Sequence, residues 1–305
     1  MSHEPLLISF GGVVIGFYGC PPSVWEEPLL QFAQPDAAAD VRIYVKETAV
    51  LPKPTDAMVL YTAVGFRMLG SGTKRWAFRS DPNLAHAPDC AVLCYDTDSS
   101  DEQMLFFDPR RMELNVQSLL SSIMLETLLV RHGRCILHAS YILHQQCGIL
   151  FSAPSGAGKS TQAELWRRHR GAQIINGDKA IFYTDREGVK VSGLPLCGSS
   201  GICRKAVAPL QAVVVLSHGR ENRISRMGGK AAVKALLSQM YVRRGESESV
   251  AQAMALASEA VTRVPVFQLS CLPDSTAVEC LEKAIHGEHD SEGNDAVKIS
   301  SRQGS

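Results

Sequence analysis

The stretch "GILFSAPSGAGKSTQAELWRRHR", residues 148–170, constrains this chain more than any other. An apolar run ends in a loop of small residues, and an amphipathic segment with basic residues near its end follows. A strand, a tight loop and a helix in this order surround one point with backbone N–H groups and a helix N-terminus, an arrangement that suits an anion. The sequence therefore predicts a phosphate-binding loop at residues 153–161.

Each part of this loop has a chemical task. Gly156 and Gly158 allow the tight turn, Lys159 supplies charge for the outer phosphates, and Ser160 supplies a hydroxyl for Mg²⁺. Ala153 replaces the first glycine of the strict pattern, at a strand end that needs no positive φ. A plain glycine-rich turn is the alternative, which the intact "GKST" and its flanks disfavour. The residues expected to bind the nucleotide are Ser155, Gly156, Ala157, Gly158, Lys159, Ser160 and Thr161.

A phosphoryl-transfer site also needs an acidic group near the reacting phosphate. The segment "AQIINGD" puts Asp178 directly after an apolar run, although Asn-Gly-Asp is also turn chemistry. His138 lies in "RCILHASYI", a predicted strand that pairs with the strand before the loop. A lone histidine on an apolar strand is more often a core residue, but its place beside the loop favours a functional role. Asp178 and His138 are therefore candidate catalytic residues.

The hydrophobic periodicity divides the chain into four parts. Residues 1–112 contain short alternating segments and predict a β-rich domain with an antiparallel sheet. Residues 113–132 have helical spacing and predict a helix that joins two domains. Strand and helix patterns alternate through 133–286, which holds the phosphate loop. Residues 287–305 are polar and rich in Gly and Ser, so we expect a disordered tail.

The composition excludes several classes of partner. Lys+Arg and Asp+Glu both number 31, so no bulk nucleic-acid or anionic-membrane partner is expected. No signal peptide or membrane-length apolar segment is present, which predicts a cytoplasmic protein. The chain has 9 cysteines and no C-x-x-C pair. We therefore expect reduced thiols rather than disulfides or a zinc site.

Two segments carry a family resemblance. "LHASYILHQQCGILFSAPSGAGKSTQAELWRRHRGAQIINGD" resembles the C-terminal domain of the HPr serine kinase/phosphorylase family, whose core is shared with phosphoenolpyruvate carboxykinase. "GLPLCGSSGICRKAVAPLQAVVVLSHGRENRISRM" is similar to HPr-kinase-like relatives. The resemblance covers about residues 133–285. It implies an α/β fold in which the β-rich N-terminal domain is followed in sequence by a C-terminal P-loop kinase core. This core is built on a mixed sheet with flanking helices.

The resemblance implies ATP- and Mg²⁺-dependent transfer of phosphate to a serine hydroxyl. Lys159 would hold the phosphates, Ser160 and Asp178 would hold Mg²⁺, and His138 would assist the phosphate or the base. The chain departs from the family at Gly177, which replaces the first acid of the family's acidic doublet. One carboxylate is therefore absent, and His138 or Glu164 is a candidate for the missing role.

The segment "CGSSGICRK", residues 197–205, is a candidate active-site loop. Ser199 and Ser200 would contact phosphate or substrate, and Arg204 and Lys205 would neutralise transition-state charge. A flexible surface loop with two basic residues is the alternative.

The acceptor implied by the resemblance is a serine-containing peptide, a protein or free serine. No segment matches the HPr-binding region of true HPr kinases, so HPr itself is not expected. Those kinases are oligomers, so the resemblance makes a homo-oligomer possible for this chain as well.

Two other functions remain as alternatives to the kinase. One is a nucleotide-binding sensor or peptide-binding module without turnover, which Gly177 favours; the weaker one is carboxykinase-like chemistry, whose metal-binding His and Lys set cannot be placed.

Overall fold

A computed structural model describes most of the chain. The described residues are 4–84, 86–99, 101–154, 156–243, 247–287 and 297–299. The chain is a mixed α/β protein with a β-rich N-terminal half, and it divides into two units. Unit 1 comprises Met1–Leu128 and Arg243–Ser247, and unit 2 comprises Leu129–Val242 and Glu248–Ser305. The tail expected to be disordered lies outside the described residues, except for Gly287 and residues 297–299, which form β17.

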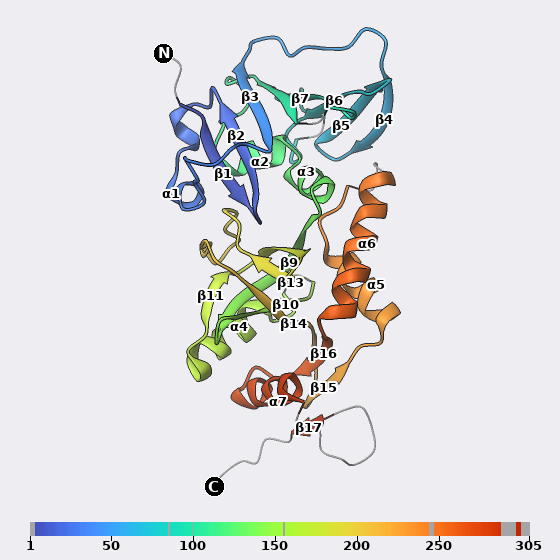
Figure 1. Cartoon of the computed structure of the whole chain (residues 1–305). Helices are drawn as coiled ribbons and strands as arrows, with labels where there is room; N and C mark the ends of the chain where they lie inside the picture. The colour runs from blue at the N-terminus through green and yellow to red at the C-terminus, as the bar shows by residue number, and fades with distance from the viewer. Residues whose placement is uncertain are drawn as a thin grey trace. The chain divides into compact units, whose positions relative to one another are not determined.

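Unit 1 contains an eight-stranded sheet with the order β1-β2-β3-β8-β7-β6-β5-β4. Figure 1 shows strands β1 to β7 of this sheet in blue and blue-green. Its strands are β1 (Leu6–Phe10), β2 (Val13–Tyr18), β3 (Val41–Glu47), β4 (Met58–Ala63), β5 (Phe66–Ser71), β6 (Lys74–Arg79), β7 (Ala91–Asp96) and β8 (Glu102–Phe107). The expectation of an antiparallel sheet is wrong for two pairs, because β2–β3 and β3–β8 are parallel. Between β2 and β3 lies a crossover, which parallel neighbours require, with η1 (Pro22–Val24) and α1 (Glu27–Leu30).

The segment 113–132 forms two helices where one was expected. These are α2 (Val116–Ser122) and α3 (Leu125–Arg131). Asn115 caps α2 by accepting a backbone N–H of the first turn. Between the helices, Met124 adopts a φ of 51°, a left-handed conformation that interrupts a right-handed helix. The division between the two units falls inside α3.

Unit 2 contains a nine-stranded mixed sheet. Its order is β10-β9-β12-β13-β14-β16-β15-β17, with β11 beside β9 and β10 also beside β14. The strands are β9 (Arg134–His144), β10 (Cys147–Ser152), β11 (Gln173–Asn176), β12 (Lys179–Asp185), β13 (Gly188–Ser192), β14 (Val207–His218), β15 (Asn222–Arg226), β16 (Val266–Cys271) and β17 (Val297–Ile299). The helices that pack on it are α4 (Lys159–Arg170), α5 (Gly229–Gln239), α6 (Ser247–Arg263) and α7 (Ser275–His286).

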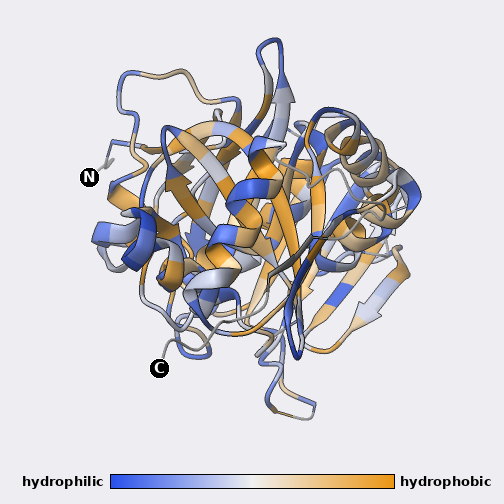
Figure 2. Cartoon of the chain, turned by 90° about the horizontal axis from the view of Figure 1, so that it is seen from below, coloured by the Kyte–Doolittle hydropathy of each residue, from blue (hydrophilic) through white to orange (hydrophobic). Residues whose placement is uncertain are grey.

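Helices cover both faces of this sheet. Alternate residues of β14 enter two different buried clusters, since Val213 belongs to one and Val214 to the other. The first cluster includes residues of α5 and α6, and the second includes Trp166 of α4 and Leu281 of α7. Figure 2 shows the result in colour, with hydrophobic strands behind helices that carry hydrophilic residues. Of the helices in the described part of the chain, none combines the length and the apolar character that crossing a membrane requires.

Candidate functional site

The 153–161 loop leaves the carboxyl end of β10 and leads directly into α4. Gly156 and Gly158 have φ values of 80° and 95°, which only glycine adopts without strain. Gly158 is the N-cap of α4, and no side chain of the described residues caps it. Both glycines therefore adopt the tight-turn conformation that the sequence predicts for them.

The space over this loop is open. Apart from their chain neighbours, no heavy atom of the described residues lies within 4 Å of the place where a Cβ would stand on Gly156 or Gly158. Ser160 and Thr161 are exposed on the first turn of α4, whereas Ser155 lies outside the described residues. Uncapped amides at a helix N-terminus and open space above them fit an anionic group.

Lys159 is buried at the start of α4, with 7% of its surface exposed. Its Nζ donates to the carbonyl oxygens of Ala153 (2.8 Å) and Pro154 (3.3 Å) and lies 2.9 Å from Nε2 of His138. Burial lowers the pKa of this ammonium, while Asp178 opposes the shift. An ammonium held by neutral acceptors at the mouth of the loop can exchange them for phosphate oxygens, which form stronger hydrogen bonds.

Strand pairing brings the loop and Asp178 together across β9. Ser152, at the end of β10, pairs with Ala139, and Lys179, at the start of β12, pairs with His138. Ser152 also donates its hydroxyl to the His138 carbonyl at 3.0 Å. His138 therefore lies between the end of the strand that feeds the loop and the turn that holds Asp178.

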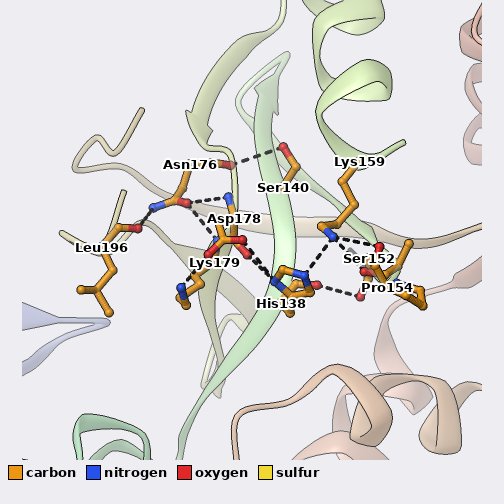
Figure 3. A network of polar contacts seen from close by, with 10 residues as sticks. His138, Ser140, Ser152, Pro154, Lys159, Asn176, Asp178, Lys179 and Leu196 are labelled. Atoms are coloured by element: carbon orange, nitrogen blue, oxygen red, sulfur yellow. Dashed lines mark hydrogen bonds and ion pairs between the residues drawn. The ribbon is translucent and has the colours of Figure 1, made fainter. Parts of the chain in front are cut away.

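His138 bridges Lys159 and Asp178 (Figure 3). Its Nδ1 lies 3.1 Å from the backbone oxygen of Asp178 and 3.3 Å from Oδ1 of the same residue. Because an ammonium can only donate, Nε2 accepts from Lys159 and the proton of the neutral ring lies on Nδ1. Burial and the nearby ammonium lower the pKa of His138. The histidine is thus neutral at pH 7 and links the lysine to the carboxylate.

Asn176 holds the turn that carries Asp178. This side chain is fully buried, and its Oδ1 accepts the backbone N–H groups of Asp178 and Lys179, both at 2.9 Å. Its Nδ2 donates to the carbonyl oxygens of Leu194 and Leu196, both at 3.1 Å. The sequence marks Asn-Gly-Asp as turn chemistry, but it did not reveal that Asn176 also binds the carbonyl groups of residues 194 and 196.

Two further residues, Lys179 and Tyr241, join this group. Lys179 forms an ion pair with Asp178, and its Nζ lies 5.4 Å from the ring centroid of Tyr241. The same tyrosine ring meets His138 edge-on at 6.2 Å. Because Lys179 follows Asp178 directly in the sequence, its place in the site could have been predicted. Tyr241 lies in a segment distant in sequence, so its place in the site could not.

The 197–203 loop covers Gly177. A Cβ on Gly177 would lie 2.9 Å from Cβ of Ser200 and closer still to its Oγ. A Cβ on Gly198 would lie 2.8 Å from Cγ of Asp178. These two glycines therefore allow the loop to pack directly on the Gly177–Asp178 turn. Ser199 is exposed on the same loop.

Cys197 and Cys203 form a disulfide across this loop, with their Cα atoms 5.0 Å apart. The expectation of reduced thiols is therefore wrong for this pair, whereas the other seven cysteines are free. A turn brings the pair together, because the N–H of Gly201 donates to the Gly198 carbonyl and Gly201 has a φ of 65°. The spacing of the two cysteines along the chain did not predict that the loop turns back and brings them together.

The remaining predicted residues have other surroundings. Arg204 lines a pocket of about 310 Å³ together with Glu164 and Arg167, and none of the lining residues belongs to the His138–Lys159–Asp178 group. Lys205 is exposed. Glu164 accepts hydrogen bonds from Arg167 and Arg168, which lower its pKa to about 2. A carboxylate of such low basicity is a poor general base.

Replacing Gly177 with alanine should lower the free energy of unfolding by about 1–2 kcal/mol, because the new Cβ overlaps Ser200 and forces the loop to shift. The φ of Gly177 is not positive, so backbone strain contributes nothing. Urea unfolding checks this loss. The double variant Gly177→Ala/Ser200→Gly should recover most of it, and a double variant no more stable than Gly177→Ala would contradict the packing described here.

The lowered pKa of His138 predicts a pH effect on stability. As the pH falls below 6.5, this ring becomes protonated in the unfolded chain before it does in the folded chain, because the folded pKa is lower. Stability is therefore full above the ordinary histidine pKa and decreases as the pH falls through the lowered folded value. Urea unfolding at pH 7.5 and 5 should show a smaller decrease for His138→Gln than for the natural chain, and equal decreases would refute the neutral histidine.

No family model matches the chain, and no curated protein matches it either. Among solved structures, it is similar to the Hpr(Ser) kinase/phosphatase from Coxiella burnetii. The similarity covers 50% of this chain and 97% of that one, with 11% sequence identity and a TM-score of 0.30. A structural resemblance of this size is distant, and the chemistry of the site is judged from its own residues.

Proposed function

We propose that this chain binds Mg·ATP at the 153–161 loop and transfers the terminal phosphoryl group to a serine hydroxyl of a peptide, a protein or free serine. One observation carries the proposal: His138 joins the buried ammonium of Lys159, at 2.9 Å, to the carboxylate of Asp178, at 3.3 Å. A cation beside an open anion-binding loop and a carboxylate next to it are the two groups that phosphoryl transfer needs.

The residues of the site divide the work as follows. Lys159 and the amides of Gly156, Ala157 and Gly158 bind the phosphates. Asp178, whose side chain is 25% exposed, accepts the proton of the attacking hydroxyl. His138 keeps Asp178 and Lys159 in place and, as a neutral ring, adds no positive charge that would compete for the carboxylate.

The residues present also fit Mg²⁺. In proteins this ion is held by one or two carboxylates together with phosphate oxygens and water. The exposed hydroxyls of Ser160 and Thr161 stand on the first turn of α4, and Asp178 supplies one carboxylate. Ser160 and Asp178 would hold the ion, which when bound neutralises charge on the phosphates.

A panel of acceptors tests the proposal. The full chain is incubated with Mg²⁺, ATP and either free serine or serine-containing peptides, and ADP release and acceptor phosphate are both measured. We expect ADP release that depends on the acceptor and a phosphoserine product. Nucleotide binding without any transfer, across the panel, would overturn the assignment as a kinase.

Binding without turnover is the second candidate function, and Gly177 favours it. Gly177 supplies no second carboxylate to the turn, and Ser200 fills the space that a side chain at this position would take. A chain of this kind would act as a nucleotide sensor or a peptide-binding module. Calorimetry with Mg·ATP combined with the acceptor panel separates the two functions.

A further inference from the structure

Ser200 lies directly over the Gly177–Asp178 turn. The absence of a side chain at Gly177 makes room for Ser200, and the absence of one at Gly198 lets the loop backbone approach Asp178. A side chain at either glycine would prevent this approach. The result is a serine of the chain itself packed on Gly177, the residue before the aspartate that is expected to take a proton from a serine hydroxyl.

The structure fixes this serine in place through its loop. The Cys197–Cys203 disulfide closes the loop, and Cys203 forms a β-bridge with Asn176, the residue that holds the turn. The N–H of Arg204 donates to the Ile175 carbonyl at 2.9 Å. These three connections tie both ends of the loop to the segment that carries Asp178.

The hydroxyl of Ser200 is chemically able to react. The residue is exposed, and its Oγ accepts the backbone N–H of Ile202 at 3.3 Å. That contact uses an oxygen lone pair, and within the described part of the chain the hydroxyl hydrogen has no partner. A second lone pair and a transferable proton are the requirements for an acceptor in phosphoryl transfer.

We infer that Ser200 is a phosphoacceptor of its own chain. This inference rests on the proposed function and names a substrate for it. The Ser200 Oγ forms a bond to the γ-phosphorus of ATP while the bond from that phosphorus to the β–γ bridging oxygen breaks. The hydroxyl proton passes to the Asp178 carboxylate, and ADP leaves.

Phosphate mapping tests the inference. The full chain is incubated with Mg²⁺ and ATP, without added acceptor, and the modified residue is located by mass spectrometry of proteolytic fragments. We expect one phosphate on Ser200, at least 10-fold less in Ser200→Ala and in Lys159→Met, and no change in Ser238→Ala. Ser238 is the matched control, since it is an exposed serine on α5 in the same unit.

The kinetics test whether the reaction is intramolecular. The phosphorylated fraction should rise with the same rate constant over a 100-fold dilution of the protein, because acceptor and base belong to one chain. A rate proportional to protein concentration, or phosphate on Ser199 with Ser200 unmodified, would overturn the inference.

The outcomes separate this inference from the proposed function. Transfer to an added serine peptide, with Ser200 unmodified, overturns the inference and leaves the proposed function standing. Failure to bind Mg·ATP, together with no phosphate on any serine, overturns both.

Discussion

Lys159→Met should weaken the binding of Mg·ATP by about 100-fold, a loss of about 3 kcal/mol in binding free energy. Methionine keeps the length and apolar stem of lysine but removes the ammonium that would contact the phosphates. Hydrogen bonds between charged groups are about twice as strong as neutral ones, and burial of Lys159 strengthens them further. Calorimetric titration of both proteins with Mg·ATP measures the difference.

The control for this variant is Lys234→Met, which removes an exposed lysine from α5 in the same unit. Its affinity for Mg·ATP should equal that of the natural chain. Thermal unfolding shows whether Lys159→Met stays folded, as we expect, since the lost ammonium bonds only neutral acceptors. A folded Lys159→Met protein with unchanged affinity would show that the nucleotide does not bind at this loop.

Asp178→Asn should slow phosphoryl transfer by about 100- to 10,000-fold, the range that loss of a general base produces. The amide keeps the size of the carboxylate but cannot take the proton of the acceptor hydroxyl. Affinity for Mg·ATP should fall less than the transfer rate, because Lys159, the loop amides and Ser160 remain, although the proposed Mg²⁺ site loses its carboxylate. Initial rates of acceptor phosphorylation at saturating ATP check this prediction.

Asp185→Asn is the matched control, because Asp185 is exposed and ends β12, the strand that begins directly after Asp178. Its Oδ1 only accepts the backbone N–H groups of Glu187 and Gly188, which an asparagine oxygen also accepts. This variant should transfer phosphate at the rate of the natural chain. If Asp178→Asn also does so, Asp178 is not the base.

The strand pairs near the site were predictable because their signals are local. The segments "CILHASYIL" and "QCGILFSA" each form a short apolar run bounded by turn residues, and they pair as β9 and β10. Pair direction in unit 1 was not predictable. The alternation of apolar residues in β2, β3 and β8 is the same for parallel and antiparallel neighbours, so it did not reveal that two pairs are parallel.

The break between α2 and α3 was also not predictable from the sequence, for a different reason. Residues 114–131 have an apolar periodicity that continues through Met124, and no Gly or Pro interrupts it. Tertiary packing holds this buried methionine at a positive φ, which local propensity would not favour. The disulfide between Cys197 and Cys203 was missed for a related reason, because a loop's fold-back depends on what it packs against.

The sequence by itself determined the glycine-rich turn between β10 and α4. Its glycines, lysine and hydroxyls stand within a few residues between a strand and a helix, so backbone sterics and local geometry dictate the shape. Only the tertiary structure decided that Asp178 lies beside His138, 40 residues away in sequence, and that Ser200 fills the space over Gly177. Those contacts depend on strand register and on loop packing between distant segments, which a short stretch of sequence does not encode.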